Sequence, residues 1–368
     1  MNPPFRVLVW QWGRFGAGPR IAVALAEGFR AVPGVQATLS LSPQAEIMQG
    51  ATPPACDLPV GTYNGRAGFA ARILTAPWSI RTLARRLRDL APDLAVCAMP
   101  GPLDLVMTAA LRRNGTRFVV LVHDADTHPG DGLPLQMWLQ RRLCRAASAV
   151  ACLSSHVGER LRAQGLVRGP LIHLSHPPMH FGVPPPISHG GPARLLHFGR
   201  LLPYKGLDLL VEALTRLGPR ADLTVRIAGF GPETPELDAL RRLPNVAVEN
   251  RWVPEEQVGA LLEWSDALIL PYREASQSGV AAAALAAGRA VVATNVGGLA
   301  EQLAGEQRAL LCEPTAIGLE GALRRLLDHP PAPAAAAADP VEPWRDMAAS
   351  LLRQLGVTPT VANPVEIR

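Results

Sequence analysis

The most constraining feature of this 368-residue chain is a twofold alternation of strand-length apolar runs with helix-length segments. Such alternation is typical of βαβ units that build a parallel sheet. The first series of predicted strands comprises 5–10, 35–41, 94–99, 118–123 and 149–153. The second comprises 194–198, 223–228, 246–248, 267–270, 290–293 and 309–312. The sequence therefore predicts an α/β protein with two successive sheets.

A segment rich in Pro, Gly and His separates the two series. Residues 178–192 lack an apolar period, which is typical of a linker between compact units. We therefore expect Rossmann-like domains over 1–177 and 193–330, because one core rarely grows to this chain length. Residues 331–368 predict a Pro/Ala linker and a tail. A helical pattern over 344–355 has one apolar face, which we expect to pack back on the first domain.

Composition excludes several classes of protein. Hydrophobic residues make up 48% of the chain and charged residues 18%, which excludes a largely disordered chain. The five cysteines lack metal-ligand spacing, so neither a zinc site nor a disulfide framework is predicted. No apolar run predicts a membrane span and no secretion signal is recognisable, so we expect a cytoplasmic protein, at most at the inner face of the membrane.

Lys205 is the single lysine in a chain with 36 Lys and Arg residues. Lysine provides a compact point charge, whereas arginine provides a planar fork, so a site that needs the former would keep its lysine. Lys205 follows the strand 194–198 on the same loop as Arg200. The two cations could clamp a diphosphate whose charge grows as it leaves. Chance survival of one surface lysine is the alternative.

Two glycine-rich turns follow predicted strands. Gly16 and Gly18 lie between the first strand and a helix, where free amides and the helix dipole suit phosphate. Their spacing does not match the dinucleotide fingerprint, and a merely tight turn is the alternative. Gly229 and Gly231 form a similar turn after the strand 223–228. Both turns are candidates for donor binding.

The strand 118–123 brings His123 and Asp124 to its carboxyl end, where ligands bind in open α/β sheets. His123 could donate a hydrogen bond to a sugar hydroxyl, or it could be a structural histidine that caps the strand. Asp124 and Asp126 spell a D-x-D pattern. We do not expect a metal there, because no further carboxylates are nearby.

The segment 270–279 joins another strand to a helix of small residues. Glu274 could accept hydrogen bonds from sugar hydroxyls, and the amides of Ser278 and Gly279 would face phosphate at a helix N-terminus. Ser276 and Gln277 lie on the same stretch and are further candidates for donor binding. A plain loop with an exposed glutamate is the alternative.

Together these motifs resemble glycosyltransferase family 4. The resemblance covers most of residues 190–325 and is specific in order and spacing, through Gly199-Arg200, Lys205-Gly206, Gly229-Phe230-Gly231, 271–279 and 295–298. It implies a GT-B fold, in which two Rossmann-like domains face each other across a cleft. It also implies retaining transfer of a sugar from a nucleotide diphosphate, usually without a bound metal or other cofactor.

The family assigns roles to the matching residues of the second half. Those that match Arg200 and Lys205 bind the donor diphosphate, and the one that matches Glu274 holds donor-sugar hydroxyls. The amides that match Ser278 and Gly279 support the phosphates. No protein carboxylate need act as the nucleophile, because a donor phosphate oxygen can accept the proton of the acceptor hydroxyl.

The first half matches the family less closely, through the Gly16–Gly18 turn, His123-Asp124 and Ser154-Ser155-His156. The resemblance implies that His123 lies at the donor sugar and that the Gly16 turn lies near the diphosphate and the acceptor. One departure is Ala282, where the family often has a second glutamate that contacts the ribose. Ribose must then be recognised by other groups.

Arginine is concentrated in the first half of the chain. Residues 1–170 contain 19 arginines against ten acidic residues, which indicates an anionic partner. The helical pattern 78–90 has an apolar stripe beside Arg81, Arg85 and Arg88, and Trp138 lies in a similar helix. These patterns predict peripheral contact with anionic lipid, or else two ordinary surface helices. Nucleic acid is not expected, because few aromatic residues are interleaved with the arginines.

The function that the sequence predicts is retaining transfer of a hexose from a UDP- or GDP-sugar to a hydroxyl of a glycan or lipid-linked acceptor, in polysaccharide or glycolipid biosynthesis. Two alternatives stay open. A sugar-nucleotide epimerase of the same architecture would need paired acid and base groups. A non-catalytic sugar-nucleotide-binding protein would bind the donor without turnover.

Overall fold

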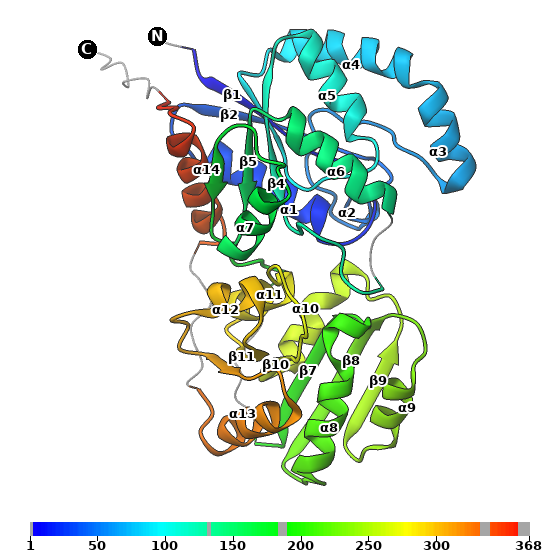
Figure 1. Cartoon of the computed structure of the whole chain (residues 1–368), viewed down its shortest axis with the longest axis vertical. Coiled ribbons are helices and arrows are strands. Elements are labelled where there is room, and N and C mark those ends of the chain that lie inside the picture. Colours follow the sequence, from blue (N-terminus) through cyan, green and yellow to red (C-terminus); the bar gives the residue numbers. More distant parts are fainter. Residues whose placement is uncertain (1–2, 131–133, 183–189, 332–338, 360–368) are drawn as a thin grey trace. The chain divides into compact units, whose positions relative to one another are not determined.

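The computed structural model describes residues 3–130, 134–182, 190–331 and 339–359, which form two compact units (Figure 1). The first unit comprises Met1–Asp126, Leu133–Ser175 and Val341–Arg368. The second comprises Thr127–Gly132 and His176–Pro340. The short segment that begins at Thr127 therefore groups with the second unit, although the sequence predicts it within the first domain. The expected linkers 178–192 and 331–341 lie partly outside the described residues.

The first unit contains a six-stranded sheet in the order β2-β1-β3-β4-β5-β6, and all of its neighbours are parallel. The strands are β1 (Phe5–Gln11), β2 (Val35–Leu41), β3 (Leu94–Cys97), β4 (Arg117–Val122), β5 (Ala149–Cys152) and β6 (Leu171–His173). The strand order reverses between β1 and β3, where open α/β sheets bind ligands. The edge strand β6 is the one strand of this sheet that the sequence does not predict.

Helices cover both faces of the first sheet. They are α1 (Ala17–Arg30), α2 (Glu46–Gln49), α3 (Gly65–Leu74), α4 (Ala76–Leu90), α5 (Asp104–Arg113), α6 (Pro134–Ala146), α7 (Ser155–Ala163) and α14 (Glu342–Gln354). Helices α4 to α7 pack on the face of Leu8 and Trp10. Helix α1 packs on β1 and β2, and α14 packs on α1. A side chain at Gly28 would collide with the Trp344 carbonyl, so glycine permits this close packing. The expected return of the C-terminal helix to the first domain is confirmed.

The second unit also contains six parallel strands, in the order β12-β11-β10-β7-β8-β9. They are β7 (Ala193–Arg200), β8 (Leu223–Phe230), β9 (Val246–Asn250), β10 (Ala267–Leu270), β11 (Ala290–Thr294) and β12 (Ala309–Cys312). This is the doubly wound Rossmann order, and its strand order reverses between β7 and β10. The loops that follow β7 and β10 therefore meet at the edge where a ligand is expected.

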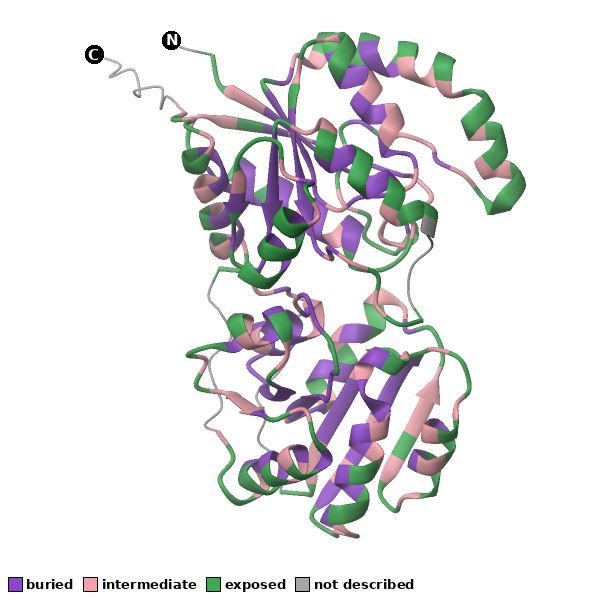
Figure 2. Cartoon of the chain, in the orientation of Figure 1, coloured by how far each residue is buried: buried purple, intermediate pink, exposed green. Residues whose placement is uncertain are grey.

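Two layers of helices enclose the second sheet. They are η1 (Pro203–Lys205), α8 (Leu207–Leu217), α9 (Pro235–Arg242), α10 (Glu255–Trp264), α11 (Gly279–Ala286), α12 (Gly297–Leu303) and α13 (Ala316–Asp328). Helices α8, α9 and α13 share a core with one face, and α10, α11 and α12 share a core with the other. The strands are mostly buried, whereas the helices expose their outer sides (Figure 2). Among the described residues, no helix combines the length and apolar character that spanning a bilayer requires.

Candidate active site

Tyr204 is the centre of the polar cluster at the carboxyl edge of the second sheet. It lies in the short helix η1 after β7 and is 4% exposed. Its hydroxyl accepts a hydrogen bond from Arg200 Nη2 at 3.0 Å, and its carbonyl accepts one from the Arg273 amide at 2.8 Å. Tyr204 therefore ties the loop after β7 to the loop after β10, and it orients the Arg200 guanidinium.

Lys205 is half-buried over two aromatic rings. Its Nζ lies 3.7 Å from the ring centroid of Tyr272 and 4.8 Å from that of Tyr204. The next residue, Gly206, has a φ of 69°, and a side chain there would collide with the Pro271 carbonyl. Glycine thus lets the two loops approach each other. Cation–π contacts hold Lys205 against these two rings. One of the rings, Tyr204, also accepts the hydrogen bond from Arg200.

An ion pair fixes the same two loops from outside. The Arg273 guanidinium donates hydrogen bonds to the Asp208 carboxylate in the first turn of α8. Burial alone would raise the pKa of Asp208, but the hydrogen bonds and charge of Arg273 outweigh burial and lower it. The pair is partly exposed, so we assign it an orienting effect rather than a large stabilising one.

The layer beneath Lys205 contains two buried polar rings. His197 Nδ1 donates to the Ile269 carbonyl at 3.0 Å, and its Nε2 is buried without a hydrogen-bond partner among the described residues. Burial lowers the pKa of His197 to about 4; the Ile269 hydrogen bond opposes this shift, and the Lys205 charge adds to it. Burial likewise raises the pKa of Tyr272 to about 12. Both rings are neutral near pH 7, so they add no charge beside Arg200 and Lys205.

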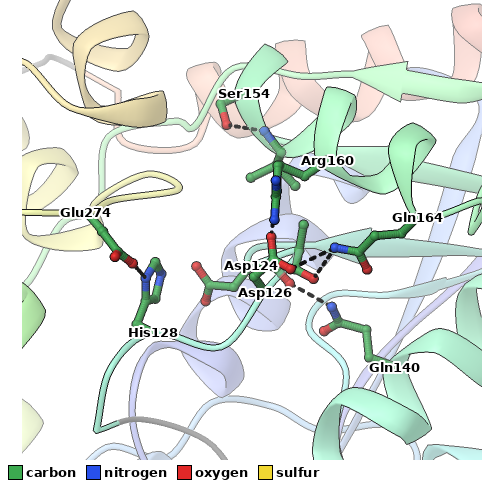
Figure 3. Close-up of polar contacts among 10 residues, drawn as sticks. Asp124, Asp126, His128, Gln140, Ser154, Arg160, Gln164 and Glu274 are labelled. Atoms are coloured by element: carbon green, nitrogen blue, oxygen red, sulfur yellow. Dashed lines mark hydrogen bonds and ion pairs between the residues drawn. The ribbon is translucent and has the colours of Figure 1, made fainter.

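The loop after β10 positions Glu274 and the start of α11. The Glu274 side chain is 55% exposed, and its Oε2 lies 3.4 Å from His128 Nδ1 (Figure 3). Ser276 is buried and Gln277 is half-buried. Ser278 is the N-cap of α11, since its hydroxyl accepts a hydrogen bond from the Ala281 amide at 3.1 Å.

One detail of this helix start differs from expectation. The Ser278 amide, which the sequence assigns to phosphate, donates to Gln302 Oε1 at 2.8 Å. Gln302 Nε2 in turn donates to the Ser278 carbonyl at 3.0 Å. The Gln302 side chain, on α12, thus satisfies both the amide and the carbonyl of Ser278. Gly279, the first residue of α11, keeps its predicted place at the helix N-terminus.

Gly199, Gly229 and Gly231 lie closer to strand backbone than the sequence indicates. Gly199 and Gly229 are paired residues within β7 and β8, not loop residues. A side chain at Gly229 would collide with the Gly199 carbonyl, and one at Gly231 with the Leu201 carbonyl. The Gly231 amide donates to Asn250 Oδ1 at 3.1 Å. Close backbone packing therefore requires glycine at both positions, and donor binding by this turn stays a prediction.

The predicted turn at Gly16 and Gly18 lies at the carboxyl end of β1 in the first unit. Gly16 has a φ of 81° and is the N-cap of α1, which has no side-chain cap. The buried Gln11 side chain accepts from the Gly13 amide at 2.8 Å. A side chain at Gly18 would come within 2.7 Å of Gln11 Nε2. The helix therefore starts without a side-chain cap, and donor binding by this turn stays a prediction.

His123 lies at the end of β4 and is 4% exposed. Its Nε2 donates to the Ala98 carbonyl at 2.9 Å, so the ring connects β4 to β3. Burial lowers the pKa of His123, while the Ala98 hydrogen bond and the charge of Asp124 oppose that shift. This geometry agrees with a structural role, which is one of the two roles that the sequence leaves open for His123. The other role, at the donor sugar, stays a prediction.

Side chains from α6 and α7 contact both residues of the D-x-D pattern, Asp126 through its carboxylate and Asp124 through its backbone carbonyl (Figure 3). Asp126 accepts from Arg160 Nε and from Gln164 Nε2, both at 2.8 Å. The Asp124 carbonyl accepts from Gln140 Nε2 at 2.6 Å. Within the described ranges, no group of three or more His, Cys, Asp or Glu side chains is arranged to hold a metal ion.

The structure thus brings Arg200, Lys205 and the loop of Glu274 together at one edge of the second sheet, while Gly16, Gly18 and His123 lie in the first unit. Sequence analysis did not single out Tyr204 or Tyr272. Composition contains a signal for them, because the chain has only three tyrosines and two lie in this cluster. No comparable signal marks His197 or Gln302.

Comparison with known families agrees with the order of these motifs. Residues 34–177 match the family described as glycosyltransferase family 4, and residues 192–329 match the one described as glycosyl transferases group 1. Each match covers the greater part of one unit.

Two relatives match part of the chain. The glycogen synthase of Mycobacterium tuberculosis is 37% identical over 147 residues, which are 39% of this chain and 36% of that protein. The GDP-mannose:glycolipid 4-β-D-mannosyltransferase of Xanthomonas campestris is 32% identical over 115 residues, which are 28% of this chain and 30% of that protein. The matches therefore span about a third of the length of these relatives.

Solved structures match nearly the whole chain at low identity. Anabaena HepE in complex with UDP and glucose has a TM-score of 0.64 at 15% identity, and covers 96% of this chain and 98% of that one. The UDP-GlcNAc 2-epimerase of Neisseria meningitidis has a TM-score of 0.58 at 11% identity, and covers 95% and 99%. The expected pair of Rossmann-like domains of the GT-B type is confirmed, but fold alone does not separate transferases from epimerases. On its matches to both family models, the chain belongs to glycosyltransferase family 4.

Proposed function

We propose that this protein is a retaining glycosyltransferase that moves a hexose from a UDP- or GDP-sugar to a hydroxyl of a glycan or lipid-linked acceptor. The observation that carries the proposal is the pair of cations, Arg200 and Lys205, which Tyr204 and Tyr272 orient at the carboxyl edge of the second sheet. A diphosphate is the ligand that suits this pair, because it offers several anionic oxygens over a short span.

The same geometry supports a role in the reaction. As the bond between sugar and phosphate breaks, negative charge grows on the leaving diphosphate. Donors that are already oriented stabilise this charge more than they stabilise the ground state, and one such group contributes about 3 kcal/mol. Glu274, which is partly exposed on the neighbouring loop, would accept hydrogen bonds from the sugar hydroxyls.

The relatives support the chemical class of both substrates. The Mycobacterium match is named as a glycogen synthase, which agrees with a glycan acceptor. The Xanthomonas match is named as a GDP-mannose:glycolipid mannosyltransferase, which agrees with a nucleotide diphosphate donor and a lipid-linked acceptor.

A screen of UDP- and GDP-sugars tests the proposal. The true donor should raise the unfolding temperature, because it binds the native state, and should then be consumed when acceptors are supplied. Transfer with retained anomeric configuration, unaffected by EDTA, is the expected result. Isomerisation of the donor sugar would instead identify an epimerase. Donor binding without turnover would identify a non-catalytic binding protein.

We further propose that the first unit contacts anionic lipid through helices α3 and α4. The side chains of Ile73, Leu74 and Trp78 are 55%, 77% and 69% exposed, near the junction of α3 and α4. Arg81 and Arg85 are exposed on the same face of α4 as Trp78. Apolar side chains beside cations are the composition of a surface that inserts among lipid headgroups.

Vesicle sedimentation tests this contact. Binding to phosphatidylglycerol vesicles should exceed binding to phosphatidylcholine vesicles and should weaken with salt. Trp78→Ser and the double change Arg81→Glu with Arg85→Glu should each weaken binding about tenfold or more. Trp252→Ser, at a partly exposed tryptophan of the second unit, is the matched control. Equal binding to both lipids would contradict the proposal.

A further inference from the structure

The chain segment that follows Asp126 lies on the proposed donor site of the second unit. Residues Thr127–Gly132 group with the second unit, although the elements on either side of them belong to the first. Gly130 has a φ of 80°, and a side chain there would come within 3.3 Å of Pro203 Cδ. The described part of the segment therefore packs closely against η1, which also contains Tyr204 and Lys205.

His128 is the polar side chain by which this segment contacts the site. Its ring stacks on Tyr204, with centroids 4.6 Å apart and planes 15° apart. Its Nδ1 lies 3.4 Å from Glu274 Oε2, and the two side chains point toward each other (Figure 3). The His128 side chain is 13% exposed, whereas that of Glu274 is 55% exposed. One imidazole thus touches both the loop after β7 and the loop after β10.

The chemistry of this contact is directional. A carboxylate can only accept, so the hydrogen of the His128–Glu274 contact is on Nδ1. The stack on Tyr204 fixes the plane of the ring, which in turn fixes the direction of the N–H group. His128 contacts Glu274 through Oε2, and more than half of the Glu274 side chain stays exposed. A sugar hydroxyl can therefore reach a carboxylate whose orientation is already set.

We propose that His128 is a positioning residue for the donor sugar: its imidazole, stacked on Tyr204, orients the Glu274 carboxylate toward the sugar hydroxyls. This inference rests on the proposed function of the site. Because Arg200 and Lys205 bind the diphosphate in that function, His128 affects recognition of the sugar and leaves recognition of the nucleoside diphosphate unchanged. It restricts Glu274 before the donor arrives, which reduces the entropy lost on binding.

The test compares two affinities in each variant: that for the nucleotide sugar found in the donor screen, and that for the matching nucleoside diphosphate alone. His128→Phe keeps an aromatic ring for the stack but removes the N–H group. It should weaken binding of the nucleotide sugar and lower kcat/KM about tenfold, while affinity for the nucleoside diphosphate stays the same. His128→Gln keeps an N–H donor and should retain part of the lost affinity. His329→Gln, at an exposed histidine of the same unit, is the control.

A double-mutant cycle with Glu274→Gln distinguishes positioning from general loss of structure. If His128 acts through Glu274, the effects of His128→Phe and Glu274→Gln on sugar affinity should not add. Additive effects, an unchanged sugar affinity in His128→Phe, or an equal loss of nucleoside diphosphate affinity would each overturn the role of His128 while the wild type still transfers sugar. A wild type that binds no nucleotide sugar would overturn the proposed function and this inference together.

Discussion

The carboxyl edges of the two sheets have a similar topology but differ in the burial and charge of their side chains. At the edge of the first sheet, polar side chains are buried: Asp104 and His123 are 0% and 4% exposed, and both are hydrogen-bonded to neighbouring backbone. At the edge of the second sheet, Arg200 is exposed and Lys205 is half-buried over aromatic rings. The two buried side chains of the first edge are hydrogen-bonded within the protein, whereas the second edge presents two cations to solvent. Two sheets of similar topology therefore differ in the ligand that they suit, because the side chains at their edges differ in burial and charge.

The largest expected effect is at the cationic edge. Lys205→Ala should lower kcat/KM by about 100-fold to 1000-fold, because in the proposed function this oriented charge stabilises the leaving diphosphate. Lys205→Arg should restore little, because a planar fork does not replace a compact charge held over Tyr272. Steady-state kinetics would measure both effects.

Lys205→Ala should leave the free energy of unfolding nearly unchanged, because the lysine charge is partly exposed. Unfolding in urea provides this comparison, and Arg324→Ala on the outer face of α13 is a control that keeps activity. An active Lys205→Ala enzyme would remove the basis of the assignment.

The edge of the first sheet should respond to pH instead. Burial raises the pKa of Asp104 from 3.8 to about 6, although hydrogen bonds from Gly101, Trp10 and Cys97 oppose the shift. The folded protein therefore binds this proton more tightly than the unfolded chain does. The resulting stabilisation is fully present below about pH 4 and is lost as pH rises through about 6, which amounts to roughly 3 kcal/mol.

Asp104→Asn isolates that contribution. The variant cannot titrate at this position, so its free energy of unfolding should vary less between pH 4 and pH 7 than that of the wild type. Urea titrations at several pH values would measure the difference. The same pH dependence in both proteins would show that the buried carboxyl does not titrate in this range.

The smallest effect is expected at the start of α11. Gln302→Leu removes two hydrogen bonds to the Ser278 peptide and should cost about 1–2 kcal/mol of stability. The freed Ser278 amide would then be available to an anion. Chemical denaturation with and without nucleoside diphosphate measures both consequences. Gln36→Leu, at an exposed strand position, should change stability by less than about 0.5 kcal/mol, and an equal loss there would argue against a specific role for Gln302.

The architecture could be predicted from the sequence alone. Apolar runs predicted eleven of the twelve strands that lie in the described part of the chain, because strands buried on both faces are apolar along their whole length. The exception, β6, has three residues at a sheet edge, too few for a recognisable pattern. The apolar face of α14 predicted its return to the first domain. Lys205 could be singled out because it is the one lysine of the sequence.

Which groups meet, and which amides already have a hydrogen-bond partner, could be seen only in the folded protein. The sequence pattern at Gly229 and Gly231 predicts a phosphate-binding turn. In the structure, their close neighbours are backbone atoms of β7 and of the residue after it. Tyr204 contacts His128 and Arg273, which lie far from it in sequence. Sequence patterns record the local period of a strand or helix. Contacts across a sheet edge depend on strand order and loop packing, which bring together residues that no local pattern connects.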